Sequence, residues 1–146
     1  MILPNFKGFP RSRLLGVDWG ARRTGIAVSF DDGMFVATRP VVNMAKYSHA
    51  ELAETIAKIA KDERCDGIVV GLPLRMDGTE SDTTAMVREF VAVLETKTDL
   101  PIVMIDETLS SDAASENIRR ADIKEKLDSA AARVILENAI AMIKRA

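Results

Sequence analysis

The sequence predicts one α/β domain, a five-stranded mixed sheet flanked by helices. Three short apolar runs separated by turn signals fall within the first 40 residues, as in an antiparallel meander. After residue 48, two continuous apolar runs alternate with segments of helical periodicity, which is typical of parallel strands joined by right-handed crossovers. The length of 146 residues is that of a single domain. We therefore expect three antiparallel strands followed by two parallel ones.

The first half of the chain supplies the three antiparallel strands. Leu14–Asp18 is an apolar run that ends on a carboxylate, and Gly25–Ser29 follows a turn that contains Gly and Arg. An Asp-Asp-Gly hairpin signal precedes the third run, Met34–Ala37. Residues 1–12 contain two prolines and show no periodicity, so we expect a loose tail there. The single domain is then expected over residues 13–146.

The second half supplies parallel strands and helices. Ile68–Leu72 is a continuous apolar run, as expected of a strand that is covered on both faces, and Pro101–Glu107 is another buried strand that ends in carboxylates. Ser48, with Glu51 three residues later, predicts a helix start through a capping box. Further helices are expected over Glu80–Lys97, with Met86, Phe90, Val93 and Leu94 facing inward, and over Ser111–Arg119 and Ile123–Lys144.

The composition excludes several classes of protein. With 47% apolar and 29% charged residues and a net charge of −2, the chain is neither disordered nor broadly basic. Nucleic-acid binding would therefore depend on local basic patches. No apolar run approaches the ~18 residues of a membrane span, and the first residues lack the pattern of a signal peptide. The single cysteine, Cys65, fits a reducing compartment, so we expect a cytoplasmic protein.

Four acidic residues are candidates for a functional site. Asp18 ends the first strand, Asp106 and Glu107 end the last one, and Asp128 begins the C-terminal helix. In open α/β sheets, sites gather beyond the carboxyl ends of the strands. Each acid also has a purely structural interpretation, as a cap, a solvated strand end or a partner of the helix dipole. Asp128 shares one helical stripe, which should face the sheet, with Ala132, Ile135, Ala139 and Met142.

Converging carboxylates require compensation of their charge. Two unit charges about 4 Å apart repel by ~4 kcal/mol at an effective dielectric constant of about 20. A divalent cation removes this cost, and oxygen ligands suit Mg²⁺ or Mn²⁺ rather than Zn²⁺. The lone His49 and the lone Cys65 also argue against zinc, and we expect them to be packing or surface residues. One or two such ions can activate water and stabilise the leaving oxygen in phosphodiester cleavage.

Two loops offer contacts for phosphate groups. Arg22 and Arg23 follow the first strand in a glycine-containing turn, and the guanidinium fork matches phosphate oxygens. Arg75 and Thr79 lie in the loop after the fourth strand, which is not a Walker loop because it lacks Gly-Lys-Ser/Thr. A tight hairpin and a structural crossover loop are the alternative interpretations of these segments. Trp19 is expected to pack beneath the site rather than to stack on a base.

Four segments of the chain resemble motifs of the YqgF (RuvX-like) family. They lie within residues 14–140, and four individually weak motifs in the right order make a specific match. The third segment carries Thr108 where the family usually has Arg, so a phosphate contact by that Arg is absent here. The four segments are Leu15–Val28, Val70–Thr79, Asp106–Ser111 and Asp128–Glu137.

The resemblance implies an RNase H-like fold, which Holliday-junction resolvases share. It also implies a metal-dependent nuclease that trims the 5′ end of pre-16S rRNA in ribosome biogenesis. The catalytic and metal-binding carboxylates would be Asp18, Asp128 and one of Asp106 and Glu107. We favour Glu107 slightly as the inward ligand, and because adjacent strand residues point to opposite faces, both can hardly serve equally.

Other functions stay open from the sequence alone. A resolvase of branched DNA would use the same acids and would need two active sites, hence a dimer. A non-catalytic nucleic-acid-binding factor in ribosome assembly would present only a charged surface. The Asp-Trp-Gly loop also resembles the first phosphate loop of sugar-kinase-like and actin-like ATP binders, but those need two such domains and this chain has the length of one. We expect a nucleic-acid partner, with pre-rRNA favoured, and no membrane partner.

Overall fold

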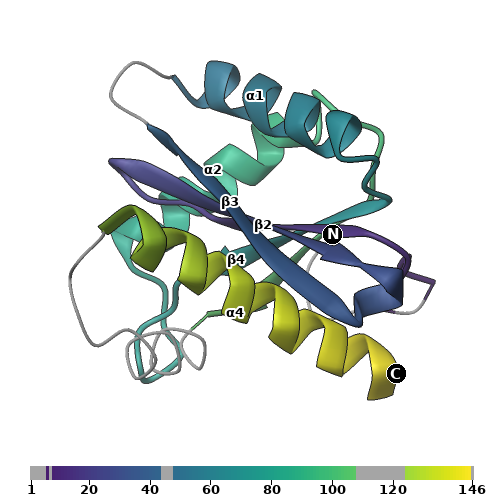
Figure 1. Cartoon of the computed structure of the whole chain (residues 1–146). Helices are drawn as coiled ribbons and strands as arrows, with labels where there is room; N and C mark the ends of the chain where they lie inside the picture. The colour runs from purple at the N-terminus through teal and green to yellow at the C-terminus, as the bar shows by residue number, and fades with distance from the viewer. Residues whose placement is uncertain (1–5, 7, 44–47, 108–123, 146) are drawn as a thin grey trace.

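The computed structural model describes residues 6, 8–43, 48–107 and 124–145, and within its last helix the side chains of residues 129–144. Its strands are β1 (Leu14–Asp18), β2 (Arg23–Phe30), β3 (Phe35–Asn43), β4 (Gly67–Leu72) and β5 (Ile102–Asp106). They form one sheet in the order β3-β2-β1-β4-β5 (Figure 1). β1 pairs antiparallel with β2, and β2 with β3, whereas β4 pairs parallel with β1 and with β5. This confirms the expected mixed sheet.

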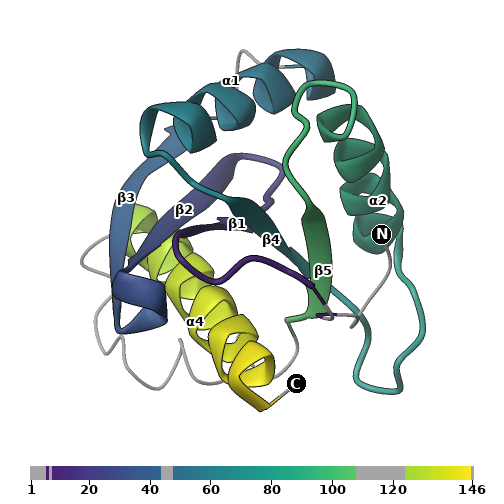
Figure 2. The same ribbon diagram turned by 90° about the vertical axis from the view of Figure 1, so that its right-hand side faces the viewer.

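Helices cover both faces of the sheet. α1 (His49–Asp62) and α2 (Asp82–Leu94) lie on one face, and α4 (Lys124–Arg145) crosses the other (Figure 2). Alternate residues of the central strands therefore point into two different hydrophobic cores, one shared with α1 and α2 and one shared with α4. No helix in the described part of the chain combines the length and the apolar composition that crossing a bilayer requires.

The predicted helix starts occur with small shifts. α1 begins after Ser48, whose hydroxyl accepts a hydrogen bond from the backbone N–H of Glu51 over 3.2 Å. α2 begins after Ser81, which forms a reciprocal capping box with Thr84, so this helix starts at Asp82 rather than at Glu80. The Asp-Asp-Gly turn between β2 and β3 forms a single 3-10 turn, η1 (Asp31–Gly33).

The inward face of α2 differs in part from the prediction. Phe90 and Leu94 are buried as expected, but Met86 is 41% exposed, so its predicted inward position is wrong. Val87 and Val91 are buried instead. Positions 87, 90, 91 and 94 share one stripe of a helix, whereas position 86 is rotated by about 100° from its neighbour at 87.

Helix α4 approaches the sheet closely because two central strands carry glycine where they face it. A Cβ atom on Gly16 of β1 would lie 2.9 Å from the Cβ of Leu136 and 3.0 Å from the carbonyl oxygen of Ala132. A Cβ atom on Gly71 of β4 would lie 2.5 Å from the Cδ1 of Ile135. The expected inward stripe is confirmed at Ala132, Ile135 and Ala139, which are buried, whereas Met142 is only partly buried. The side chains of Leu136, Ile140 and Ile143 are buried as well.

The expectation of a loose N-terminal segment is wrong for the residues that the structure describes there. Phe6 and Phe9 are buried and pack edge to face, with ring centroids 5.8 Å apart. Both join the core that α4 shares with the sheet, and Arg11 donates a hydrogen bond to the carbonyl oxygen of Ile143 over 3.0 Å. The burial of two aromatic side chains thus holds this segment against the core, although its sequence has no regular periodicity.

The lone cysteine and the lone histidine are packing residues, as expected. Cys65 is buried, and burial raises the pKa of its thiol to about 12, so the thiol stays protonated at neutral pH. The ring of His49 lies edge-on to Trp19 at 5.9 Å between centroids and to Phe90 at 6.5 Å.

Replacing Gly16 with Val should loosen the contact between α4 and β1. The added carbons would meet the helix backbone at Ala132, so we expect the free energy of unfolding to fall by about 1–3 kcal/mol. Urea denaturation followed by circular dichroism measures this change. Met34→Gln, at a side chain that is 72% exposed, is the control and should leave the midpoint unchanged. Equal midpoints for Gly16→Val and wild type would contradict the close approach of the helix.

Candidate active site

Two of the predicted acidic residues lie together at the edge of the sheet. Asp18 is the last residue of β1, and Glu107 follows the last residue of β5, with β4 between the two strands. Their side chains share a hydrogen bond. The backbone N–H of Glu107 donates to the carbonyl oxygen of Leu72 over 3.2 Å, which continues the pairing of β4 and β5 by one residue. The parallel register thus brings together acids that are far apart in the sequence.

The pleat of the strands turns both side chains toward α4. On β5, Ile105 packs in the core shared with α4, whereas Met104 packs in the core shared with α1 and α2. Glu107 therefore lies on the α4 side and Asp106 on the opposite side, where its side chain is exposed. This geometry supports Glu107 rather than Asp106 as the partner of Asp18.

Gly71 makes the space that the Glu107 carboxylate occupies. A Cβ atom on Gly71 would lie 2.7 Å from the Oε2 of Glu107, closer than any ordinary contact. Gly71 was not among the residues predicted for the site. The available signal was a glycine inside an otherwise continuous apolar strand, which often marks a place where another group approaches closely.

The environment of Glu107 disfavours its charged form. Burial raises the pKa of this carboxyl, the hydrogen bond with Asp18 lowers it, and the negative charge of Asp106 raises it, so the pKa lies above its usual range. Without a cation, the ionised form of Glu107 is therefore disfavoured in the site that it shares with Asp18. This is the electrostatic condition under which bound positive charge is most favourable.

Asp128 belongs to the first turns of α4, but its side chain lies outside those that the structure describes. Its backbone position is one turn before Ala132, whose carbonyl oxygen faces Gly16. Its role as a third ligand remains a prediction. Among the described residues, no group of three or more His, Cys, Asp or Glu side chains is arranged to hold a metal ion.

The two predicted arginines of the first turn lie between the end of β1, at Asp18, and the start of β2. Arg22 is exposed, and Arg23 is the half-buried first residue of β2. The turn depends on Gly20, because a Cβ atom there would lie 2.3 Å from the carbonyl oxygen of Arg23. That both arginines contact substrate phosphates remains a prediction.

The loop after β4 folds into a hairpin, Leu74–Glu80, whose ends form an antiparallel bridge. The Nη1 of Arg75 donates to the carbonyl oxygen of Glu80 over 3.0 Å and to the Oγ1 of Thr79 over 3.5 Å. Both predicted contact residues thus take part in the structure of the hairpin. Their contact with substrate remains a prediction.

Trp19 packs beneath the site, as expected, and is buried in the core shared with α1 and α2. Its Nε1 is enclosed without a hydrogen-bond partner among the described residues. Thr108 lies outside the described part of the chain, and so does the helix expected over Ser111–Arg119.

The raised pKa of Glu107 predicts a specific pH dependence of stability in metal-free protein. A carboxyl whose pKa rises on folding stabilises the fold below its unfolded value of about 4.3, and this contribution is lost as the pH rises through the folded pKa. Glu107→Gln cannot ionise. We therefore expect this variant to gain stability relative to wild type as the pH increases from about 4 to neutral, measured by urea denaturation in EDTA.

Asp106→Asn is the matched control, since it removes a neighbouring exposed charge and should change this pH dependence far less. If the stability difference between Glu107→Gln and wild type is constant across the same pH range, folding does not disfavour the charged form of Glu107.

Comparison with known proteins places the chain in a family. The model of the RuvX family, described as a Holliday junction resolvase, matches residues 12–142. A protein of Maridesulfovibrio salexigens named "Putative pre-16S rRNA nuclease" is 38% identical over 134 residues, covering 88% of this chain and 98% of the relative. A protein of Oleidesulfovibrio alaskensis with the same name is 40% identical over 131 residues, covering 86% and 90%.

Solved structures agree on the fold. The RuvC protein of T. thermophilus in complex with a Holliday junction substrate matches with a TM-score of 0.61 at 12% identity, over 92% of this chain and 98% of that one. The fowlpox virus Holliday junction resolvase matches with a TM-score of 0.54 at 10% identity, over 92% and 99%. These neighbours show the expected RNase H-like fold. The family match over nearly the whole chain, and relatives of similar length, lead to one conclusion: the chain belongs to the RuvX family.

Proposed function

We propose that this protein is a divalent-metal-dependent nuclease that hydrolyses phosphodiester bonds in structured RNA, at the 5′ end of pre-16S rRNA in the cytoplasm. The observation that carries this proposal is the meeting of Asp18 and Glu107 at the carboxyl edge of the sheet. Membership of the RuvX family and the names of the relatives support the nuclease chemistry and the rRNA substrate.

The acid pair fits Mg²⁺ or Mn²⁺. Both residues offer hard oxygen ligands, and the burial that raises the pKa of Glu107 makes a bound positive charge favourable there. Asp18 and Glu107 would hold the ion from two strands, with Asp128 as a third ligand from α4. When bound, the ion supplies an activated water and stabilises the leaving oxygen.

The protein itself orients these ligands and the substrate. Gly71 leaves room for the Glu107 carboxylate, and the ends of β1 and β5, on either side of β4, hold the two acids at one edge of the sheet. Arg22 and Arg23, on the turn that follows Asp18, bind the phosphates that flank the reacting one. Rigid strand ends therefore define where the scissile phosphate lies.

Branched DNA is the second candidate substrate, because the family model carries the description Holliday junction resolvase. The relatives that are 38–40% identical carry an rRNA name, which favours RNA. A purely binding role in ribosome assembly does not account for the burial of Glu107 with a raised pKa.

Asp18→Asn and Glu107→Gln should each lower the cleavage rate by more than about 100-fold, a larger loss than changes around metal ligands usually cause. The substrates are a folded precursor segment of 16S rRNA and a four-way DNA junction, each with Mg²⁺, Mn²⁺ or EDTA. Asp106→Asn is the matched control, because the exposed carboxylate of Asp106 points to the other face of the sheet, and it should retain activity. Loss with Asp106→Asn and retention with Glu107→Gln would reverse the assignment.

Metal binding should also be visible without any substrate. At a Mn²⁺ concentration tenfold above Kd, wild-type protein should gain about 1.4 kcal/mol of stability, seen as a rise in Tm. Asp18→Asn should lose this rise, because the acid pair no longer carries its charge. An identical rise in both proteins would place the ion elsewhere.

A further inference from the structure

The Leu74–Glu80 hairpin starts two residues after the end of β4, where Leu72 accepts the backbone hydrogen bond of Glu107. The backbone N–H of Gly78 donates to the carbonyl oxygen of Arg75, and the N–H of Arg75 donates to that of Thr79, both over 2.8 Å. Gly78 adopts the left-handed region, with φ of +86°. This is a three-residue hairpin loop that ends on a left-handed glycine, with Met76 at its first position.

The polar side chains of this hairpin form hydrogen bonds within the hairpin. The Oδ1 of Asp77 accepts hydrogen bonds from the N–H of Thr79 over 2.9 Å and from its hydroxyl over 2.6 Å. These two bonds lower the pKa of Asp77, so the carboxylate stays charged and held within the turn. The guanidinium of Arg75 is bound to the other arm of the hairpin. The conformation of the tip is therefore set by its own hydrogen bonds.

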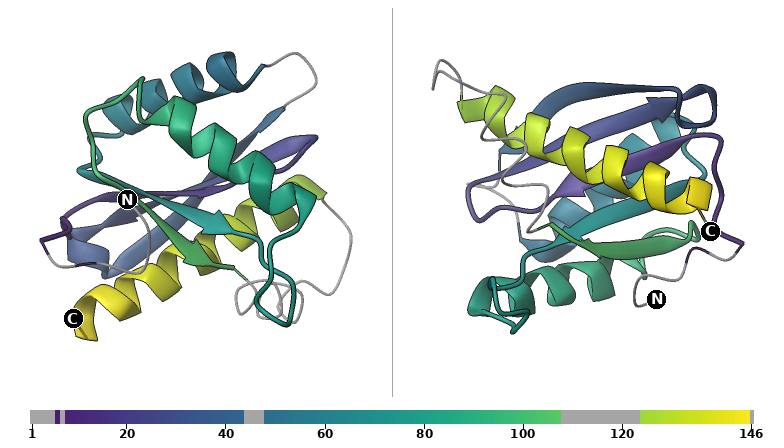
Figure 3. Two further views of the ribbon diagram at one scale, coloured as in Figure 1. Left: turned by 180° about the vertical axis from the view of Figure 1, so that it is seen from behind. Right: turned by 90° about the horizontal axis from the view of Figure 1, so that it is seen from below.

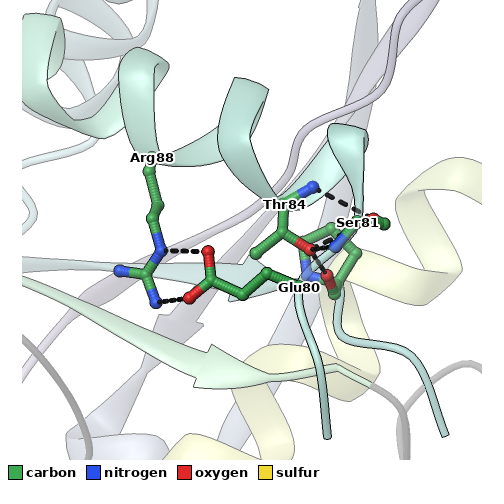
Figure 4. A network of polar contacts seen from close by, with 5 residues as sticks. Glu80, Ser81, Thr84 and Arg88 are labelled. Atoms are coloured by element: carbon green, nitrogen blue, oxygen red, sulfur yellow. Dashed lines mark hydrogen bonds and ion pairs between the residues drawn. The ribbon is translucent and has the colours of Figure 1, made fainter.

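Helix α2 fixes both arms of the hairpin at their base (Figure 4). Arg88 donates two hydrogen bonds to the carboxylate of Glu80, over 3.0 and 2.8 Å. The hydroxyl of Thr84 donates to the carbonyl oxygen of Pro73, at the start of the other arm. A bidentate ion pair and a buried hydroxyl thus hold the hairpin at a fixed angle to the sheet.

Met76 is the apolar residue that this construction presents to solvent. Its side chain is 93% exposed, more than any other large apolar side chain of the described residues. Figures 2 and 3 show the hairpin, between β4 and α2, extending beyond the carboxyl ends of β4 and β5. A single apolar side chain on a fixed tip, beside a candidate active site, differs from a broad apolar patch, which is the usual mark of a protein partner.

We propose that Met76 is a wedge that inserts between two stacked bases of the nucleic-acid substrate and so positions the backbone at the Asp18–Glu107 pair. Met is one of the apolar side chains that insert between base steps, and the inserted side chain partly unstacks the step and kinks the duplex. The inference rests on the proposed nuclease function. It assigns Met76 as a positioning residue. This role accounts for an exposed apolar side chain at the tip of a hairpin whose polar side chains form hydrogen bonds within the hairpin.

The test measures base unstacking with 2-aminopurine, whose fluorescence rises when a base loses its stacking partners. The probe is placed at successive paired positions of a folded 16S precursor RNA and of a four-way DNA junction. Glu107→Gln protein is used so that the substrate is not cut. We expect a rise at one position, its loss in Met76→Gln and its retention in Met76→Leu. Met34→Gln is the matched control, since Met34 is 72% exposed near η1, away from the acid pair.

With an intact acid pair, Met76→Gln should slow cleavage of the folded substrate by about tenfold or more, because opening a base step costs a few kcal/mol. It should leave cleavage of a short unpaired oligonucleotide unchanged. Binding without a fluorescence rise at any position, or an equal rise with Met76→Gln, would overturn the wedge while the nuclease proposal stands. Failure of the protein to bind either nucleic acid would overturn both.

Discussion

The contact between the carboxyl groups of Asp18 and Glu107 is the constraint around which this fold is best understood. Parallel pairing of β4 with both β1 and β5 brings two strand ends to one edge, and the pleat turns both acids toward α4. Burial holds the pKa of Glu107 above its usual range. Such a pair weakens the isolated fold, and the cation proposed above would offset this cost.

Much of this arrangement follows from sequence patterns. Continuous apolar runs identify β4 and β5, and their alternation with helices favours parallel pairing. The carboxyl ends of β1 and β5 are then neighbours of β4, which makes the meeting of Asp18 with the Asp-Glu pair predictable. The period of two along a strand separates Asp106 from Glu107, and the slight preference for Glu107 agrees with the geometry.

Other features depend on tertiary contacts that no local pattern encodes. Gly71 makes room for a carboxylate only because β5 lies beside β4 in one particular register. Met86 fits a helical pattern as well as Val87 does, and the packing of α2 on the sheet selects between them. Phe9 is buried although its segment lacks periodicity, because Leu14 and α4 offer it a surface. The conformation of the hairpin around Met76 likewise depends on its attachment to α2.

Anomalous diffraction from crystals grown with Mn²⁺ tests the central claim most directly. The account predicts a manganese peak between the carboxylates of Asp18 and Glu107, with both acting as ligands and the hydrogen bond between them replaced by bonds to the ion. Crystals that contain manganese elsewhere, with the two carboxyl groups still bonded to each other, would contradict it.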